Sequence, residues 1–132
     1  MVDQDTGEYI TDLVGVFDLL EKDNTGNIVV VDHKTAAKKP SDSDLDQNLQ
    51  FSCYGYATRI LQELDDRDIL LRIDCLVKNK KPVFEQRYTV RTPDNDRKLV
   101  KLASDVLNAM DTGVFLPITG WQCGTCQVSS HC

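Results

Sequence analysis

The chain has 132 residues, of which 41% are hydrophobic and 27% are charged, so it can build one domain around one core. Its formal net charge of −6 excludes a surface dominated by lysine and arginine, although a local basic groove stays compatible with that charge. No apolar run approaches the roughly 18 residues that span a bilayer, and the first residues lack a secretion signal. We therefore expect an intracellular, cytoplasmic protein without a membrane partner.

Two strands are predicted in the first third of the chain. Residues 8–20 mix aromatic and β-branched residues and lead into a turn signal at 21–27 that contains Gly26. Residues 27–35 (NIVVVDHKT) contain an unbroken apolar run, which is typical of a strand that is covered on both faces. This second strand is therefore predicted to be central in a sheet.

One amphipathic helix is predicted over residues 44–64. Apolar side chains recur there at steps of three and four, namely at Leu45, Leu49, Cys53, Tyr56, Ile60 and Leu64. The acidic run at 41–47 lacks the glycine and the terminal glutamate of a calcium loop. It fits the start of a helix, where the helix dipole favours acidic residues.

A hairpin and a second helix are predicted next. Residues 68–91 divide at the turn 78–82 (KNKKP), and the second arm alternates as a half-buried strand, with Phe84, Gln86, Tyr88 and Val90 opposite Glu85, Arg87, Thr89 and Arg91. Thr92 and Pro93 predict a helix start, and helical spacing continues to Gly113 through Leu99, Leu102, Ala103, Val106 and Met110. The expected fold is α/β (α+β), with a central mixed β-sheet flanked by α-helices.

Charged residues gather where the first two predicted strands end. Asp18 lies near the end of the first strand, and Asp32 and Lys34 lie two apart, and so on one face, near the end of the second. Neighbouring carboxylates are stable together when they share a cation, and oxygen ligands favour Mg²⁺ or Mn²⁺. A lysine beside them can stabilise charge on a phosphate or orient a water. The same residues also fit solvated strand ends with a weak ion pair.

Three motifs, in this order along the chain, resemble those of the PD-(D/E)xK nuclease superfamily. They are GVFD (15–18), VDHKT (31–35) and QFSCY (50–54), and they are most similar to the RecB-like branch, which includes the CRISPR-associated RecB-like exonucleases. The resemblance covers nearly all of 8–132 and implies a restriction-endonuclease-like core. It further implies a Mg²⁺- or Mn²⁺-dependent deoxyribonuclease, an exonuclease that hydrolyses phosphodiester bonds in DNA repair, recombination or phage- or CRISPR-type DNA processing. The implied partner is DNA, as single strands or duplex ends.

The same resemblance implies roles for residues at the strand ends. Asp18 and Asp32 resemble the two metal-binding acids, with the backbone carbonyl of His33 as an additional ligand. Lys34 resembles the catalytic lysine. The side chain of His33 is left out of the mechanism, because strand alternation points it away from its two neighbours.

Two residues of the predicted helix complete the implied site. Gln50 and Tyr54 are four apart and off the predicted apolar stripe, and they resemble the pair that shapes the site and contacts the scissile strand. Without the upstream motifs, the same pair would be interpreted as a surface amide and a partly packed phenol.

The tail at 114–132 carries a cluster of cysteines. Cys123, Cys126 and Cys132 resemble three of the four thiolate ligands of a [4Fe–4S] cluster in RecB-like iron–sulfur nucleases, with the fourth ligand missing in this chain. Thiolates in this spacing also suit zinc. Two further interpretations stay open: a zinc site completed by His131 and a redox CxxC motif.

The chain also departs from the family pattern. The family's N-terminal helix and first strand have no room before Gly15, so we expect a single domain over 1–132 that lacks both, as a truncated or reduced relative. Cys53 and Cys75 stand alone, as buried small side chains do, and neither is placed as the missing cluster ligand.

These departures keep other functions open. They favour the alternative of a catalytically silent DNA-binding or scaffold domain within a larger helicase–nuclease assembly. A third interpretation is a small zinc or redox protein defined by its tail. An exposed sheet edge would also allow two copies to pair as a homodimer.

Overall fold

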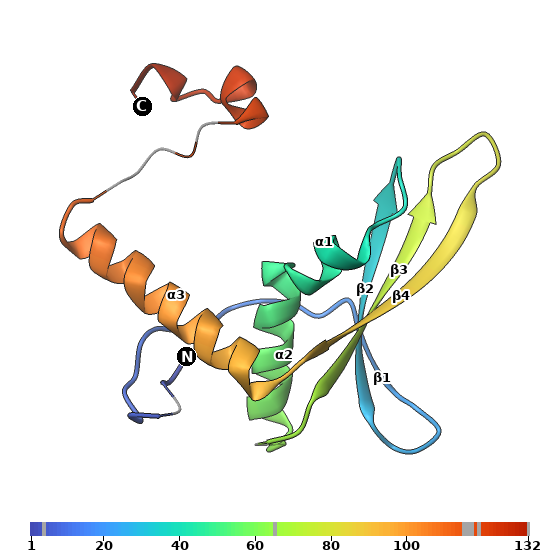
Figure 1. Ribbon diagram of the computed structural model, residues 1–132, viewed down its shortest axis with the longest axis horizontal. Helices are drawn as coiled ribbons and strands as arrows, with labels where there is room; N and C mark the ends of the chain where they lie inside the picture. The colour runs from blue at the N-terminus through green and yellow to red at the C-terminus, as the bar shows by residue number, and fades with distance from the viewer. Residues whose placement is uncertain (4, 65, 115–117, 119, 132) are drawn as a thin grey trace.

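A four-stranded mixed β-sheet organises the structure, a computed structural model that describes all residues except 4, 65, 115–117, 119 and 132 (Figure 1). The strands lie in the order β1 (Leu19–Lys22), β2 (Ile28–Ala36), β3 (Ile69–Val77) and β4 (Val83–Arg91). β2 and β3 pair in parallel, whereas β1 with β2 and β3 with β4 form antiparallel hairpins. The predicted mixed sheet and the central position of β2 are confirmed.

Three helices lie on one side of this sheet (Figure 1). α1 (Asp42–Asp46) and α2 (Leu49–Leu61) pack on the sheet and form the crossover between the parallel strands β2 and β3. α3 (Pro93–Asp111) follows β4 and packs against α2. Two short 3-10 helices, η1 (Trp121–Thr125) and η2 (Ser129–His131), form the tail. No helix in the described part of the chain is long and apolar enough to cross a bilayer.

The prediction of one helix over 44–64 is wrong, because the chain breaks between α1 and α2. Asn48 has an extended backbone and caps α2, with its side chain accepting a hydrogen bond from the Phe51 amide at 3.2 Å. α1 has its own capping box between Ser41 and Asp44. The break brings Gln50 into the first turn of α2, above the end of β2.

The first predicted strand, over 8–20, is also misplaced. β1 begins only at Leu19, and its pairing with β2 ends at Leu19 with Val31. The preceding residue, Asp18, bonds β2 through its side chain, whose Oδ2 accepts from the His33 amide at 2.8 Å. The carboxylate thus stands where a backbone carbonyl would continue the ladder, and from Asp32 onward this edge of β2 has no neighbouring strand among the described residues.

The hydrophobic core lies between the sheet and the helices. Its buried members come from β2, β3, α1 and α2 and are Val30, Leu45, Phe51, Tyr54, Ile69, Leu71, Ile73, Cys75 and Val77. Among the described residues the helices lie on this face (Figure 1). Val29 and Val31, on the other face between β1 and β3, are also buried, at 5% and 0% exposed. The prediction that the apolar run of β2 is covered on both faces is therefore confirmed.

β4 alternates as predicted, but its buried side is the polar one. Phe84 and Tyr88 are 61% and 54% exposed, whereas Thr89 and Arg91 are buried. Arg91 Nη2 reaches the carbonyls of Leu45 at 2.8 Å and Asn48 at 3.2 Å, so it satisfies backbone groups around the α1–α2 break.

A buried ion pair joins the helices to each other. Arg59 of α2 and Asp96 of α3 are 1% and 0% exposed, and Arg59 Nε lies 2.5 Å from Asp96 Oδ2. Arg59 Nη2 also donates to the Arg91 carbonyl at 3.0 Å. Since a buried charge that loses its partner is costly, this pair fixes where α2 and α3 meet the end of β4.

The predicted apolar stripes are only partly buried. In α2, Leu49 and Ile60 are 53% and 52% exposed, while the buried face carries Phe51, Tyr54, Gly55, Tyr56, Thr58 and Arg59. α3 starts at Pro93 after the Thr92 cap, as predicted, but its second half leaves the body (Figure 1) and exposes Leu102, Val106 and Met110. β1 and β4 are the edge strands, and pairing of a second copy there stays a prediction.

Candidate active site

The site begins at the end of β2, where two charged side chains point toward the helices. Asp32 and Lys34 are two residues apart and so share this face. Asp32 is 1% exposed, and its Oδ2 lies 3.2 Å from Lys34 Nζ, whose side chain is 43% exposed. A buried carboxylate therefore contacts an ammonium group that is itself half-exposed to solvent.

Side chains from α2 extend this pair into a hydrogen-bonded chain. Gln50 Oε1 accepts from Lys34 Nζ at 3.1 Å, and Gln50 Nε2 donates to the Tyr54 hydroxyl at 2.8 Å. The Tyr54 hydroxyl in turn donates to the Val16 carbonyl at 2.9 Å. Four of the five predicted site side chains are thus directly linked. Tyr54 is 9% exposed and belongs to the core, so its predicted position off the packed face is wrong.

Tyr54 also holds the segment that carries Asp18. Its ring packs against Phe17, with centroids 5.1 Å apart and planes inclined at 47°. Together with the bond to the Val16 carbonyl, this contact fixes the two residues before Asp18. Asp18 itself is exposed and is tied to β2 through the His33 amide.

The surroundings of Asp32 shift its pKa. Burial raises its pKa above the usual aspartate value, the hydrogen bond and charge of Lys34 oppose that rise, and the Asp18 carboxylate adds to it. Asp18 reaches the neighbourhood of Asp32 because its Oδ2 accepts from the amide of His33, the residue after Asp32, at 2.8 Å. The protein alone therefore compensates only part of the negative charge of ionised Asp32.

The free oxygen of Asp32 fits a divalent cation. While Oδ2 bonds Lys34, Oδ1 is buried and has no hydrogen-bond partner among the described residues, an arrangement that proteins avoid. An ion shared with Asp18 would satisfy that oxygen and relieve the repulsion between the carboxylates. No three His, Cys, Asp or Glu side chains converge in a metal-binding group within the described ranges, so an ion here would depend on the two carboxylates and on backbone oxygens.

The opposite face of the sheet carries an acidic residue that sequence reasoning did not consider. Asp74 of β3 pairs in register with His33, and Arg72 binds both of its carboxylate oxygens, at 2.7 and 3.0 Å. Although burial acts to raise the pKa of Asp74, the hydrogen bonds from Arg72 and Gln86 lower it. This carboxylate is neutralised inside the protein, and His33 points toward it as alternation predicts.

An apolar pocket of about 460 Å³ adjoins the site between residues 13–17 and α2. Gln50 and Tyr54 form its polar border, and the remaining wall is mostly aliphatic or aromatic, including Leu13, Val16, Phe17, Ala57 and Leu61. No sequence signal predicts this pocket, because the segment 13–17 is predicted as a strand rather than as a loop over α2.

The cysteines divide as expected between core and tail. Cys75 is buried in β3, and Cys53 is half-buried in α2. Cys123 and Cys126 are exposed at η1, and Cys123 Sγ accepts from the Gly120 amide at 3.4 Å. Cys132 lies outside the described residues, so the predicted iron–sulfur or zinc site stays a prediction.

A family model supplies the identification. The model of the PD-(D/E)XK nuclease superfamily matches residues 2–132. The chain belongs to this superfamily. The sheet with flanking helices agrees with its restriction-endonuclease-like fold, and membership implies a nuclease that acts on DNA, usually with divalent metals such as Mg²⁺. Comparisons with curated proteins and with solved structures gave no match.

The Asp32→Asn variant tests the cost of the buried charge. Because the pKa of Asp32 is raised, ionisation opposes folding, and metal-free stability is lost as pH rises from below the usual aspartate pKa through the raised one. In EDTA near pH 7 we expect the variant to melt about 3–5 °C above wild type, and the difference to vanish near pH 3. Adding Mn²⁺ should raise the melting temperature of wild type only. Equal responses to Mn²⁺ would contradict the assignment.

The Tyr54→Phe variant tests whether Tyr54 positions the loop that carries Asp18. Tyr56 is a matched control, because its hydroxyl accepts from the Val2 amide at 2.7 Å, away from the site. Tyr54→Phe and the control Tyr56→Phe should each lower the free energy of unfolding by about 1 kcal/mol. Only Tyr54→Phe should also weaken Mn²⁺ binding measured by calorimetry, by about tenfold. Equal Mn²⁺ affinities in the two variants would show that the Tyr54 hydroxyl is structural alone.

Proposed function

We propose that this chain is a Mg²⁺- or Mn²⁺-dependent deoxyribonuclease of the RecB-like type, which hydrolyses phosphodiester bonds as an exonuclease. The observation that carries the proposal is the carboxylate of Asp32. It is buried, one oxygen bonds Lys34, and the other has no hydrogen-bond partner in the part of the chain that the structure describes. In a member of a nuclease superfamily, a buried carboxylate with an open oxygen is the group expected to bind the catalytic ion.

The residues divide into metal ligands and groups that act on the substrate. The carboxylates of Asp18 and Asp32 and the backbone carbonyl of His33 would hold the ion. When bound, a divalent ion there would polarise the scissile phosphate and neutralise developing charge. The His33 amide fixes Asp18 on β2, so the loop before β1 and the strand β2 each supply one acid.

Lys34 is placed to act on the substrate itself. An ammonium group has three N–H donors, and two of them reach Asp32 and Gln50 within the described structure. The third can donate to a nonbridging phosphate oxygen or orient the attacking water. Its half-exposed position keeps that donor accessible, while Gln50 and Tyr54 hold its direction.

The finer assignments rest on the motif resemblance. The order GVFD, VDHKT, QFSCY supports exonuclease action in DNA repair, recombination or phage- or CRISPR-type DNA processing. The spacing of Cys123 and Cys126 supports an iron–sulfur or zinc site completed by Cys132 and a ligand not identified in this chain.

A second candidate function is a catalytically silent DNA-binding or scaffold domain. It is favoured by the two-carboxylate donor set, since no third acidic or imidazole ligand joins Asp18 and Asp32 among the residues that the structure describes. DNA binding without cleavage in Mg²⁺ or Mn²⁺ would select this function over the first.

Cleavage of single-stranded DNA with Mn²⁺ tests the proposed function. We expect wild type to degrade the strand, and Asp32→Ala and Lys34→Ala each to lower the rate by about 100-fold or more. The matched controls are Asp105→Ala and Lys101→Ala, an exposed acid and lysine paired on α3, which should retain wild-type rates. Cleavage that survives Asp32→Ala or Lys34→Ala would refute the mechanism.

A further inference from the structure

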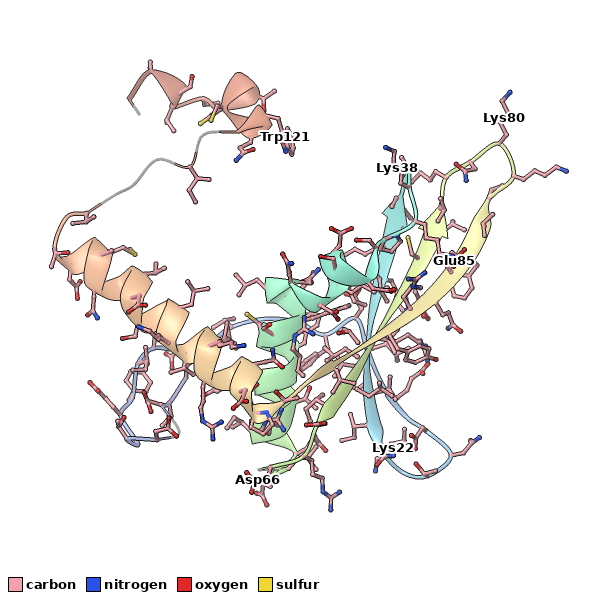
Figure 2. All side chains as sticks on the ribbon, viewed as in Figure 1. Lys22, Lys38, Asp66, Lys80, Glu85 and Trp121 are labelled. Atoms are coloured by element: carbon pink, nitrogen blue, oxygen red, sulfur yellow. The ribbon has the colours of Figure 1, made fainter. Side chains whose placement is uncertain are left out.

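Lysines gather at one end of the sheet. Lys38 and Lys39 follow β2, and Lys78, Lys80 and Lys81 form the turn between β3 and β4. The two loops are adjacent, because the Lys78 amide donates to the Ala36 carbonyl at 2.7 Å. Figure 2 shows Lys38 and Lys80 at this end of the sheet and Lys22 at the opposite end.

Most of these charges have no role inside the fold. Lys39 pairs with Glu85 at 2.6 Å. The other four, Lys38, Lys78, Lys80 and Lys81, are exposed and form no salt bridge with any described residue. In a chain of net charge −6, this end is a local concentration of positive charge.

Nearby acidic side chains are already engaged. Asp42 at the start of α1 is paired with Arg87 of β4, and Asp44 accepts from the Ser41 hydroxyl at 2.6 Å within its capping box. Glu85 is the partner of Lys39. The four lysines therefore keep a net positive potential toward solvent.

The lysine-bearing loops continue the face that carries the candidate active site. Asp32, Lys34 and Ala36 alternate onto the same side of β2. Directly beyond Ala36 lies a hollow of about 380 Å³, whose walls include Lys38, Lys39, Asn79 and Glu85. Two strand residues advance by about 7 Å, so these loops begin one side-chain length beyond Lys34. The pairing of β1 with β2 ends at Val31 of β2, so beyond Val31 this edge of β2 has no neighbouring strand in the described part of the chain.

We propose that Lys38, Lys78, Lys80 and Lys81 bind the phosphate backbone of the DNA strand whose scissile bond lies at Lys34. This inference rests on the proposed function and adds the direction in which the strand leaves the site, along β2 toward the turn between β3 and β4. Exposed ammonium groups on two adjacent loops suit evenly charged phosphates, because they act as point charges and need no fixed geometry. Their contribution is sequence-independent and sensitive to salt.

The test compares two double variants with the same change in charge. Lys38→Glu/Lys80→Glu alters the proposed surface. Lys22→Glu/Lys98→Glu alters one lysine at the opposite end of the sheet and one on α3. All proteins carry Asp32→Asn to prevent cleavage. Binding of a fluorescent single strand of about 20 nucleotides, which is longer than the proposed lysine surface, is measured by anisotropy across a salt series.

We expect Lys38→Glu/Lys80→Glu to weaken binding at low salt by about tenfold or more, and the control to bind as the parent does. The neutral variant Lys38→Gln/Lys80→Gln should lower the magnitude of the slope of log K against log salt by about 1.4, that is about 0.7 per lost contact. Melting temperatures show whether each variant is folded.

Three results would overturn the inference. They are unchanged affinity in Lys38→Glu/Lys80→Glu, an equal loss in the control, which would show only a general charge effect, and a parent that binds no DNA. The proposed function is judged separately by hydrolysis of thymidine 5′-(p-nitrophenyl phosphate) by wild type with Mn²⁺, because this small diester does not reach the lysine loops. Failure there leaves the binding result interpretable.

Discussion

The structure of the candidate site depends on one carboxylate that is buried at the end of an internal strand. Asp32 ends the apolar run of β2, and burial raises its pKa. Lys34 bonds one oxygen, and no residue within the described ranges bonds the other. A protein tolerates such a group when a ligand completes it, so the same feature that weakens the metal-free fold prepares the site for a cation.

A small number of contacts position the residues around this carboxylate. The Asn48 cap starts α2 beside the end of β2 and so brings Gln50 to Lys34. Tyr54, one turn further on, is rigid within the core and anchors the loop before Asp18. Arg91 donates hydrogen bonds to backbone carbonyls at the break between α1 and α2. The candidate site is therefore positioned by capping and buried polar bonds as much as by apolar packing.

Local sequence signals were sufficient to predict the elements that turn and capping residues determine. The hairpin around 78–82 and the helix start at Thr92 were predicted because turn and capping residues act over a few positions. The convergence of Asp32 and Lys34 followed from the two-residue period of a strand. The superfamily followed from motif order and agrees with the family match over 2–132.

What the sequence did not reveal depends on tertiary context. Leu49 and Ile60 fit a helical stripe, but the burial of α2 is decided by the sheet below it, so Phe51 and Tyr54 face inward instead. Arg59, Arg91 and Asp96 appear polar in any local window and are buried only because distant partners meet them. The start of β1 could not be placed either, since it is set by a side chain, Asp18, that substitutes for a backbone acceptor.

The most direct measurement is anomalous diffraction from crystals of this chain soaked in Mn²⁺. A site built around the open oxygen of Asp32 predicts a manganese peak bonded to Asp32 Oδ1 and to the Asp18 carboxylate, with Lys34 still beside Oδ2. No peak at Asp32 at millimolar Mn²⁺, or a peak bound only to surface carboxylates elsewhere, would contradict the account.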